Sequence, residues 1–175
     1  QGYIQTTPLQ LCLMTAQLAN GGHKIYPKII VNKNDKTYEE IKTLIEKNYE
    51  INKKINEGLS ESSESLFSFT KSKTHETLYK HFENIRLIQE AMFASTNEVR
   101  GTSYSSRIEN PKYQFAGKTG TSQVKRITAR DRELDLNTSE IPYKDRDHAL
   151  YIAFGPYKKP RYALSIVIEH GGSGS

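Results

Sequence analysis

Five consecutive residues in the second half of the chain combine a cation, two hydroxyls and small residues. They read Gly117-Lys118-Thr119-Gly120-Thr121. Lys118 supplies a fixed positive charge, and Thr119 and Thr121 supply hydroxyl donors. Gly120 has no side chain, so the backbone of a ligand can lie against it. These residue types at this spacing predict a site for a peptide that carries a carboxylate.

A β-strand must position these residues. The apolar pattern takes a period of two after Lys112, which predicts a strand over 113–124. Side chains of a strand alternate between its faces, so Lys118 points one way and Thr119 and Thr121 the other. An edge strand can also pair with an extended peptide. An ordinary edge-strand turn explains the same residues without a ligand. A Walker A loop is excluded, because the pattern Gly-x-x-x-x-Gly-Lys is absent.

A capped helix is expected near the start of the chain. Thr7 and Gln10 can form a capping box, and Pro8 suits the first helical position. The helix is predicted to begin at Pro8, to continue through the apolar run 9–19 and to end at Asn20-Gly21-Gly22. Its residues are apolar on most sides, which predicts that this helix is buried.

A second helix is predicted over about 84–97, with an earlier start near His75 left open, and 101–103 should end it. Its expected inner face is apolar and contains Ile85, Leu87, Ile88, Ala91 and Met92. Between the two helices, 32–82 is rich in Lys, Glu, Asn and Ser. We interpret this region as a polar insertion that is helical in its first half.

Two apolar strands follow a polar connection over 125–147. They are predicted over 149–154 and 162–169, and the turn residues of 155–161 make them a hairpin. Both strands are apolar nearly throughout, which predicts central positions covered on both faces. The predicted fold class is therefore α+β, with about three antiparallel strands packed with helices.

Composition excludes several classes of protein. The chain has 175 residues, which allows one domain or one piece of a larger domain. It contains no apolar run of the roughly 18 residues that a membrane span needs. Its 25 basic and 20 acidic residues are interspersed, which argues against nucleic-acid binding. Cys12 is the only cysteine, and no histidine has a ligand at suitable spacing, so we expect no metal and no cofactor.

A Lys-Thr-Gly triplet is one of the marks of serine β-lactamases and penicillin-binding proteins. The resemblance extends over several ordered blocks, which are 1–11, 19–22, 91–92 with 101–102, 115–124 and 146–172. In this order the blocks resemble transpeptidase-type penicillin-binding proteins, in particular their elongation-type members. The resemblance covers 1–31 and about 84–175. We therefore interpret residues 1–175 as the C-terminal part of one transpeptidase domain.

The resemblance implies a function in peptidoglycan cross-linking. In that family a serine attacks the terminal D-alanyl-D-alanine bond of a stem peptide, and β-lactams acylate the same serine. By resemblance, Lys118 and Thr121 are catalytic. The Lys118 amine helps hold the proton network and the electrostatics of the cleft, and the Thr121 backbone N–H helps form an oxyanion hole. Lys118, Thr119, Gly120 and Thr121 would bind the substrate and its carboxylate. The implied partners are stem peptides, β-lactams and cell-elongation proteins.

The family also needs a Ser-x-x-Lys nucleophile motif and a middle Ser-x-Asn motif. Ser68-Phe69-Thr70-Lys71 and Ser95-Thr96-Asn97 match these patterns literally. We reject both, because they lie too close together before Lys118 and because the block at 1–11 follows the middle motif in the family. The chain alone is therefore predicted to be inert. The resemblance places the parent protein at the periplasmic face of the inner membrane, held by an N-terminal membrane span that lies outside this chain. The chain itself is expected to contact no membrane.

Two other functions remain open from the sequence. The first is a D,D-carboxypeptidase or a serine β-lactamase, which would differ by a water-activating group outside this chain. The second is a non-catalytic peptidoglycan-binding or interaction module that uses only the strand of Lys118.

Overall fold

The computed structural model describes residues 4–30, 39, 42, 43, 46, 50, 77–125 and 137–174. Its regular elements in chain order are helices α1 and α4, a short 3-10 helix, strand β1, a second 3-10 helix, and strands β2 and β3. The predicted insertion at 32–82 lies almost entirely outside the described residues. So does Ser68.

Helix α1 spans Pro8–Ala19 and begins as predicted. The backbone N–H of Gln10 donates to the Thr7 hydroxyl over 3.2 Å, and the Thr7 N–H donates to the Gln10 side chain over 2.8 Å. This reciprocal pair satisfies two backbone donors that the first helical turn leaves free. Gly21 and Gly22 follow the helix with φ values of 89° and 87°, a conformation that side chains resist.

The prediction that this first helix is buried was wrong. Thr15 is its only fully buried residue, whereas Leu9 is 63% exposed and Met14 is 43% exposed. The helix packs mainly on β3 and β2 and also touches α4. Away from these contacts the helix is exposed at Leu9 and Met14, although its sequence is apolar on most sides.

Helix α4 spans Phe82–Asn97, so it begins two residues before Asn84 and after the alternative start near His75. Ile85, Met92 and Thr96 are its buried residues, and they lie on one stripe because seven and four residues separate them. The predicted inner face was wrong at Leu87 and Ile88, which are 65% and 42% exposed.

The strands form one antiparallel sheet in the order β1-β2-β3. Strand β1 spans Ala116–Ser122, β2 spans His148–Gly155 and β3 spans Tyr162–Ile168. This arrangement confirms the α+β fold class and the hairpin. The prediction that both hairpin strands are central holds only for β2, because β3 is the outer strand of the described sheet.

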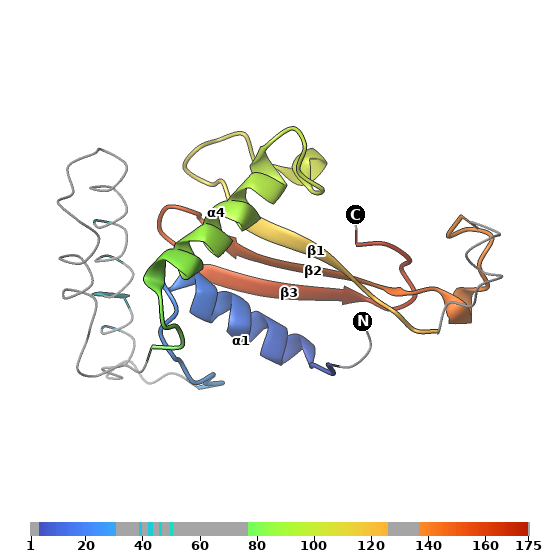
Figure 1. The fold of residues 1–175 in the computed structure, drawn as a ribbon, viewed down its shortest axis with the longest axis horizontal. Coiled ribbons are helices and arrows are strands. Elements are labelled where there is room, and N and C mark those ends of the chain that lie inside the picture. The colour runs from blue at the N-terminus through green and yellow to red at the C-terminus, as the bar shows by residue number, and fades with distance from the viewer. Residues whose placement is uncertain are drawn as a thin grey trace.

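The two helices cover the same face of the sheet, with α1 along β3 and α4 across the start of β1 (Figure 1). The core between them is built on three buried residues, Met92, Ala116 and Phe154. Six partly buried residues pack around it, namely Leu18, Ala19, Phe93, Ile152, Tyr157 and Ala163. The core thus lies where α4 meets the starts of β1 and β3 and the end of β2.

The opposite face of β3 is an apolar stripe open to solvent. Tyr162, Leu164, Ile166 and Ile168 alternate along the strand, and all four are exposed. A contiguous apolar surface on a sheet edge favours association with other chains. None of the helices in the described part of the chain is long and apolar enough to cross a membrane.

Replacing Ile166 with lysine should weaken self-association of this chain. The substitution places a charge in the centre of the stripe, where the native side chain is 48% exposed. Val99→Lys makes the same chemical change at an exposed turn residue off the sheet and is the matched control. Sedimentation velocity over a concentration series measures the effect. Equal changes for both variants would show that net charge, and not the stripe, controls association.

Candidate functional site

The predicted site residues lie on β1, which is an edge of the sheet among the described residues. Thr119 pairs with Tyr151, and Lys118 pairs with Ile152 on the helix-covered face. The predicted alternation of Lys118 and the two threonines is therefore present in the strand. Thr119, Gly120 and Thr121 are partly buried, and Lys118 is exposed.

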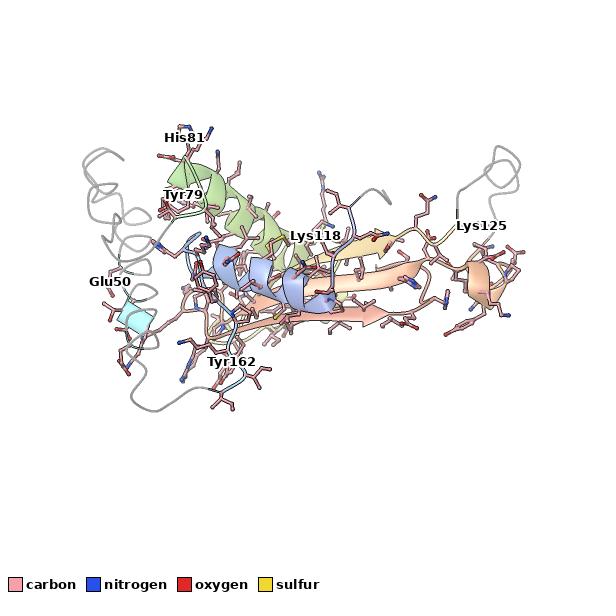
Figure 2. The ribbon with its side chains drawn as sticks, turned by 90° about the horizontal axis from the view of Figure 1, so that it is seen from below. Glu50, Tyr79, His81, Lys118, Lys125 and Tyr162 are labelled. Carbon is pink, nitrogen blue, oxygen red and sulfur yellow. The ribbon has the colours of Figure 1, made fainter. Side chains whose placement is uncertain are left out.

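Lys118, labelled on β1 in Figure 2, reaches the hydroxyl of its neighbour Thr119 with its ammonium group. Its ammonium group donates to the carbonyl oxygen of Thr119 over 2.9 Å and to Thr119 Oγ1 over 3.2 Å. The positive charge and the hydroxyl thus lie side by side although their side chains leave opposite faces. An anion near Thr119 would meet both groups.

Thr119 is the end of a row of three hydroxyls. Thr102 Oγ1 lies 3.2 Å from Thr119 Oγ1, and Ser95 Oγ lies 3.2 Å from Thr102 Oγ1. We call these three side chains the outer hydroxyl row. Sequence reasoning assigned no site role to Thr102. No local pattern marks this contact, because it depends on how the turn at Gly101 folds back on α4.

A second set of hydroxyls lies behind this row. Tyr151 Oη lies 3.3 Å from Thr96 Oγ1 and donates to Ser103 Oγ over 3.2 Å. Thr96 and Ser103 are buried, and their hydroxyl oxygens lie 3.4 Å apart. We call Thr96, Ser103 and Tyr151 the inner hydroxyl cluster. Since Tyr151 is opposite Thr119, the cluster ties the end of α4 to the part of the sheet that carries the site.

Asn97 ties the same helix end to the backbone. Its amide nitrogen donates to the carbonyl oxygens of Phe93 and Phe115, each over 2.9 Å. Phe115 directly precedes β1, so this pair of bonds holds the start of the strand against α4. The structure therefore gives Asn97 a positioning contact, while its sequence neighbour Ser95 belongs to the outer hydroxyl row.

Two glycines permit these close contacts. A Cβ at Gly117 would overlap the Tyr151 hydroxyl, and a Cβ at Gly101 would overlap the carbonyl oxygen of Ser95. Gly120 differs, because a Cβ there would meet Leu150 at 3.4 Å, an ordinary contact. Gly117 and Gly101 are therefore needed for packing, whereas Gly120 is free of that constraint.

Thr121 contacts the C-terminal end of the chain. The backbone N–H of Gly174 donates to Thr121 Oγ1 over 3.4 Å. This bond occupies a lone pair of the hydroxyl and leaves its hydrogen available to an acceptor. Within the described residues, no group of three or more histidine, cysteine or acidic side chains is arranged to hold a metal ion.

Gly117→Ala should destabilise the protein more than Gly120→Ala. The first substitution must displace the Tyr151 hydroxyl from Thr96 and Ser103, which should cost about 1–3 kcal/mol of unfolding free energy. The second adds a methyl group at contact distance and should cost less than about 1 kcal/mol. Urea denaturation of the two variants tests this difference. Equal losses would mean that the inner hydroxyl cluster contributes little to stability.

The chain matches the family model described as penicillin binding protein transpeptidase domain over residues 1–175. It therefore belongs to this family. Among named relatives, the peptidoglycan D,D-transpeptidase MrdA of Salmonella typhimurium is 29% identical over 174 residues, which is 99% of this chain and 23% of that protein. MrdA of Acinetobacter baumannii is 30% identical over 99% of this chain and 21% of its own length. The chain thus spans less than a quarter of these relatives.

Solved structures show the same relationship. Penicillin-binding protein 2 (PBP2) of Pseudomonas aeruginosa, in complex with WCK 5153, superposes with a TM-score of 0.55 at 25% identity, over 99% of this chain and 28% of that one. PBP2 of Helicobacter pylori, in complex with MreC, has a TM-score of 0.60 at 24% identity, over 98% of this chain and 22% of that one. At that identity the second match speaks for the fold alone. The predicted resemblance to transpeptidase-type penicillin-binding proteins is confirmed, and PBP2 is among the similar proteins.

Proposed function

We propose that this chain forms the edge-strand side of the active site of a peptidoglycan D,D-transpeptidase. The observation that carries the proposal is the position of Lys118 to Thr121 on an edge strand, in a chain of the transpeptidase family. Residues 1–175 would be one part of a single transpeptidase domain that includes an insertion at about 32–82. The parent enzyme would cross-link stem peptides and react with β-lactams.

The edge strand would bind the substrate by its carboxylate and its backbone. Thr119 and Thr121 would donate hydroxyl hydrogens to the terminal carboxylate, beside the Lys118 ammonium group. The substrate backbone would lie along β1 in extended form, and Gly120 would leave room for it. Lys118 would also tune the proton chemistry of the cleft.

The reaction would proceed through an acyl-serine. The serine oxygen would bond to the carbonyl carbon of the penultimate D-alanine, and the terminal D-alanine would leave as the free amino acid. The amine of a neighbouring stem would then attack the ester, form the new peptide bond and release the serine. The Thr121 backbone N–H would stabilise the oxyanion in both steps. Because the chain spans less than a quarter of its relatives, we place the serine in a longer parent protein.

The cellular setting follows by analogy with the relatives. The solved complex of Helicobacter pylori PBP2 with MreC supports a partnership with cell-elongation proteins for the parent. We place the parent at the periplasmic face of the inner membrane, where peptidoglycan is accessible, with a membrane anchor in its N-terminal part.

Thr121→Val in the parent protein should slow acylation by benzylpenicillin roughly tenfold to hundredfold. The substitution removes a hydroxyl donor to a carboxylate, and hydrogen bonds to charged groups contribute about 1.5–3 kcal/mol. Ser122→Ala on the adjacent position of β1 removes a hydroxyl that alternates to the other face and is the control. Stopped-flow acylation rates measure both. An unchanged Thr121→Val rate would remove Thr121 from the carboxylate site.

Incubation with benzylpenicillin separates the activity of the parent from that of this chain. The parent should gain one covalent adduct, at a serine outside residues 1–175. The chain alone should gain none. Intact mass followed by peptide mapping measures both results. An adduct on Ser68 would show that the rejected motif Ser68-Phe69-Thr70-Lys71 supplies the nucleophile.

A further inference from the structure

Consecutive residues at the end of α4 form parallel hydroxyl pairs with the turn that follows the helix. Ser95 pairs with Thr102, and Thr96 pairs with Ser103. The two pairs then reach two residues that lie opposite each other in the sheet. The buried pair bonds to Tyr151, and the outer pair bonds to Thr119.

We infer that Thr102 is a positioning residue that directs the hydroxyl hydrogen of Thr119 toward a bound carboxylate. The inference rests on the proposed function, because it takes the ligand of β1 to be a peptide or β-lactam with a carboxylate. Thr102 acts through Thr119 and does not itself contact the ligand.

The numbers of donors and acceptors on each group determine which hydroxyl donates to which along the outer hydroxyl row. A threonine hydroxyl has one hydrogen and two acceptor lone pairs. Lys118 can only donate, so its bond to Thr119 Oγ1 uses one lone pair. An ionised carboxylate can only accept, so Thr119 must give its hydrogen to the ligand. Thr102 must then donate to the remaining lone pair, and Ser95 donates to Thr102.

Without the Thr102 hydroxyl, Thr119 Oγ1 loses the second of its two hydrogen-bond donors and keeps only Lys118. The Thr119 hydroxyl would keep the Lys118 ammonium group at 3.2 Å but would be free to rotate its hydrogen away from the ligand. The turn fixes Thr102 from behind, because the backbone N–H of Ser103 and its hydroxyl both donate to the Ser95 carbonyl oxygen over 3.1 Å. Thr102 is thus held in place before any ligand arrives, which lowers the cost of ordering Thr119 on binding.

Thr102→Val in the parent protein tests the inference, since valine keeps the shape of threonine and removes the hydroxyl. We expect acylation by benzylpenicillin to slow about twofold to tenfold, the range for loss of one neutral hydrogen bond. Thr102→Ser keeps the hydroxyl and should restore the rate. Ser105→Ala, at an exposed serine of the neighbouring 3-10 helix, should leave the rate unchanged. Thermal unfolding of each variant checks that the fold is retained.

Two further measurements separate positioning from direct contact and from a structural role. With benzylpenicillin methyl ester, which lacks the carboxylate, Thr102→Val should have no effect. In a Thr119→Val background, Thr102→Val should add no further loss, because the residue on which it acts is gone. An equal loss with the ester, or an additive loss in the double variant, would overturn the inference.

The outcome also distinguishes the two levels of proposal. If the unsubstituted parent forms no adduct with benzylpenicillin, the proposed function fails and this inference fails with it. If the parent is acylated and Thr102→Val reacts at the unsubstituted rate, the inference alone is overturned and the transpeptidase proposal stands.

Discussion

The antiparallel register between β1 and β2 is the constraint on which the rest of the structure depends. Thr119 lies opposite Tyr151, and Lys118 lies opposite Ile152. A slip of one residue would turn the threonine to the helix-covered face and move Ala116 out of the core. Because Ala116 is fully buried against Met92 and Phe154, the core opposes such a slip. Burial on one face of the sheet therefore determines which side chains the other face offers to a ligand.

The end of α4 carries this constraint from the sheet to the surface turn. The Asn97 amide holds the backbone before β1, and Thr96 holds the Tyr151 hydroxyl from β2. Both contacts come from one helical turn, so the helix end and the first two strands form one unit. The outer hydroxyl row lies on this unit, and its geometry is fixed by groups that lie beneath it. Preorganisation of this kind favours binding, because ordering occurs on folding.

The parts of the fold that could be predicted from the sequence depend on local signals. The capping box at Thr7 and the hairpin turn between β2 and β3 each involve residues close in the chain. The failed predictions concern burial. Leu9 and Ile88 belong to apolar patterns, yet both are exposed, because burial depends on which other segments cover a helix. The open face of β3 has the same origin. An apolar pattern indicates that a surface needs a partner and does not identify the partner.

The candidate site likewise contains residues that could be predicted from local sequence and residues that could not. Lys118 to Thr121 could be found because the residues are contiguous and a strand makes their directions regular. Thr102 could not, because its contact with Thr119 exists only when Gly101 allows the turn to fold back on α4. The linear pattern Ser-x-Asn joins Ser95 and Asn97 into one motif, and the structure separates them. Ser95 faces the outer hydroxyl row, whereas Asn97 bonds to the backbone. Neighbours in a pattern can therefore serve different elements, and the packing of those elements decides which hydroxyls reach a ligand.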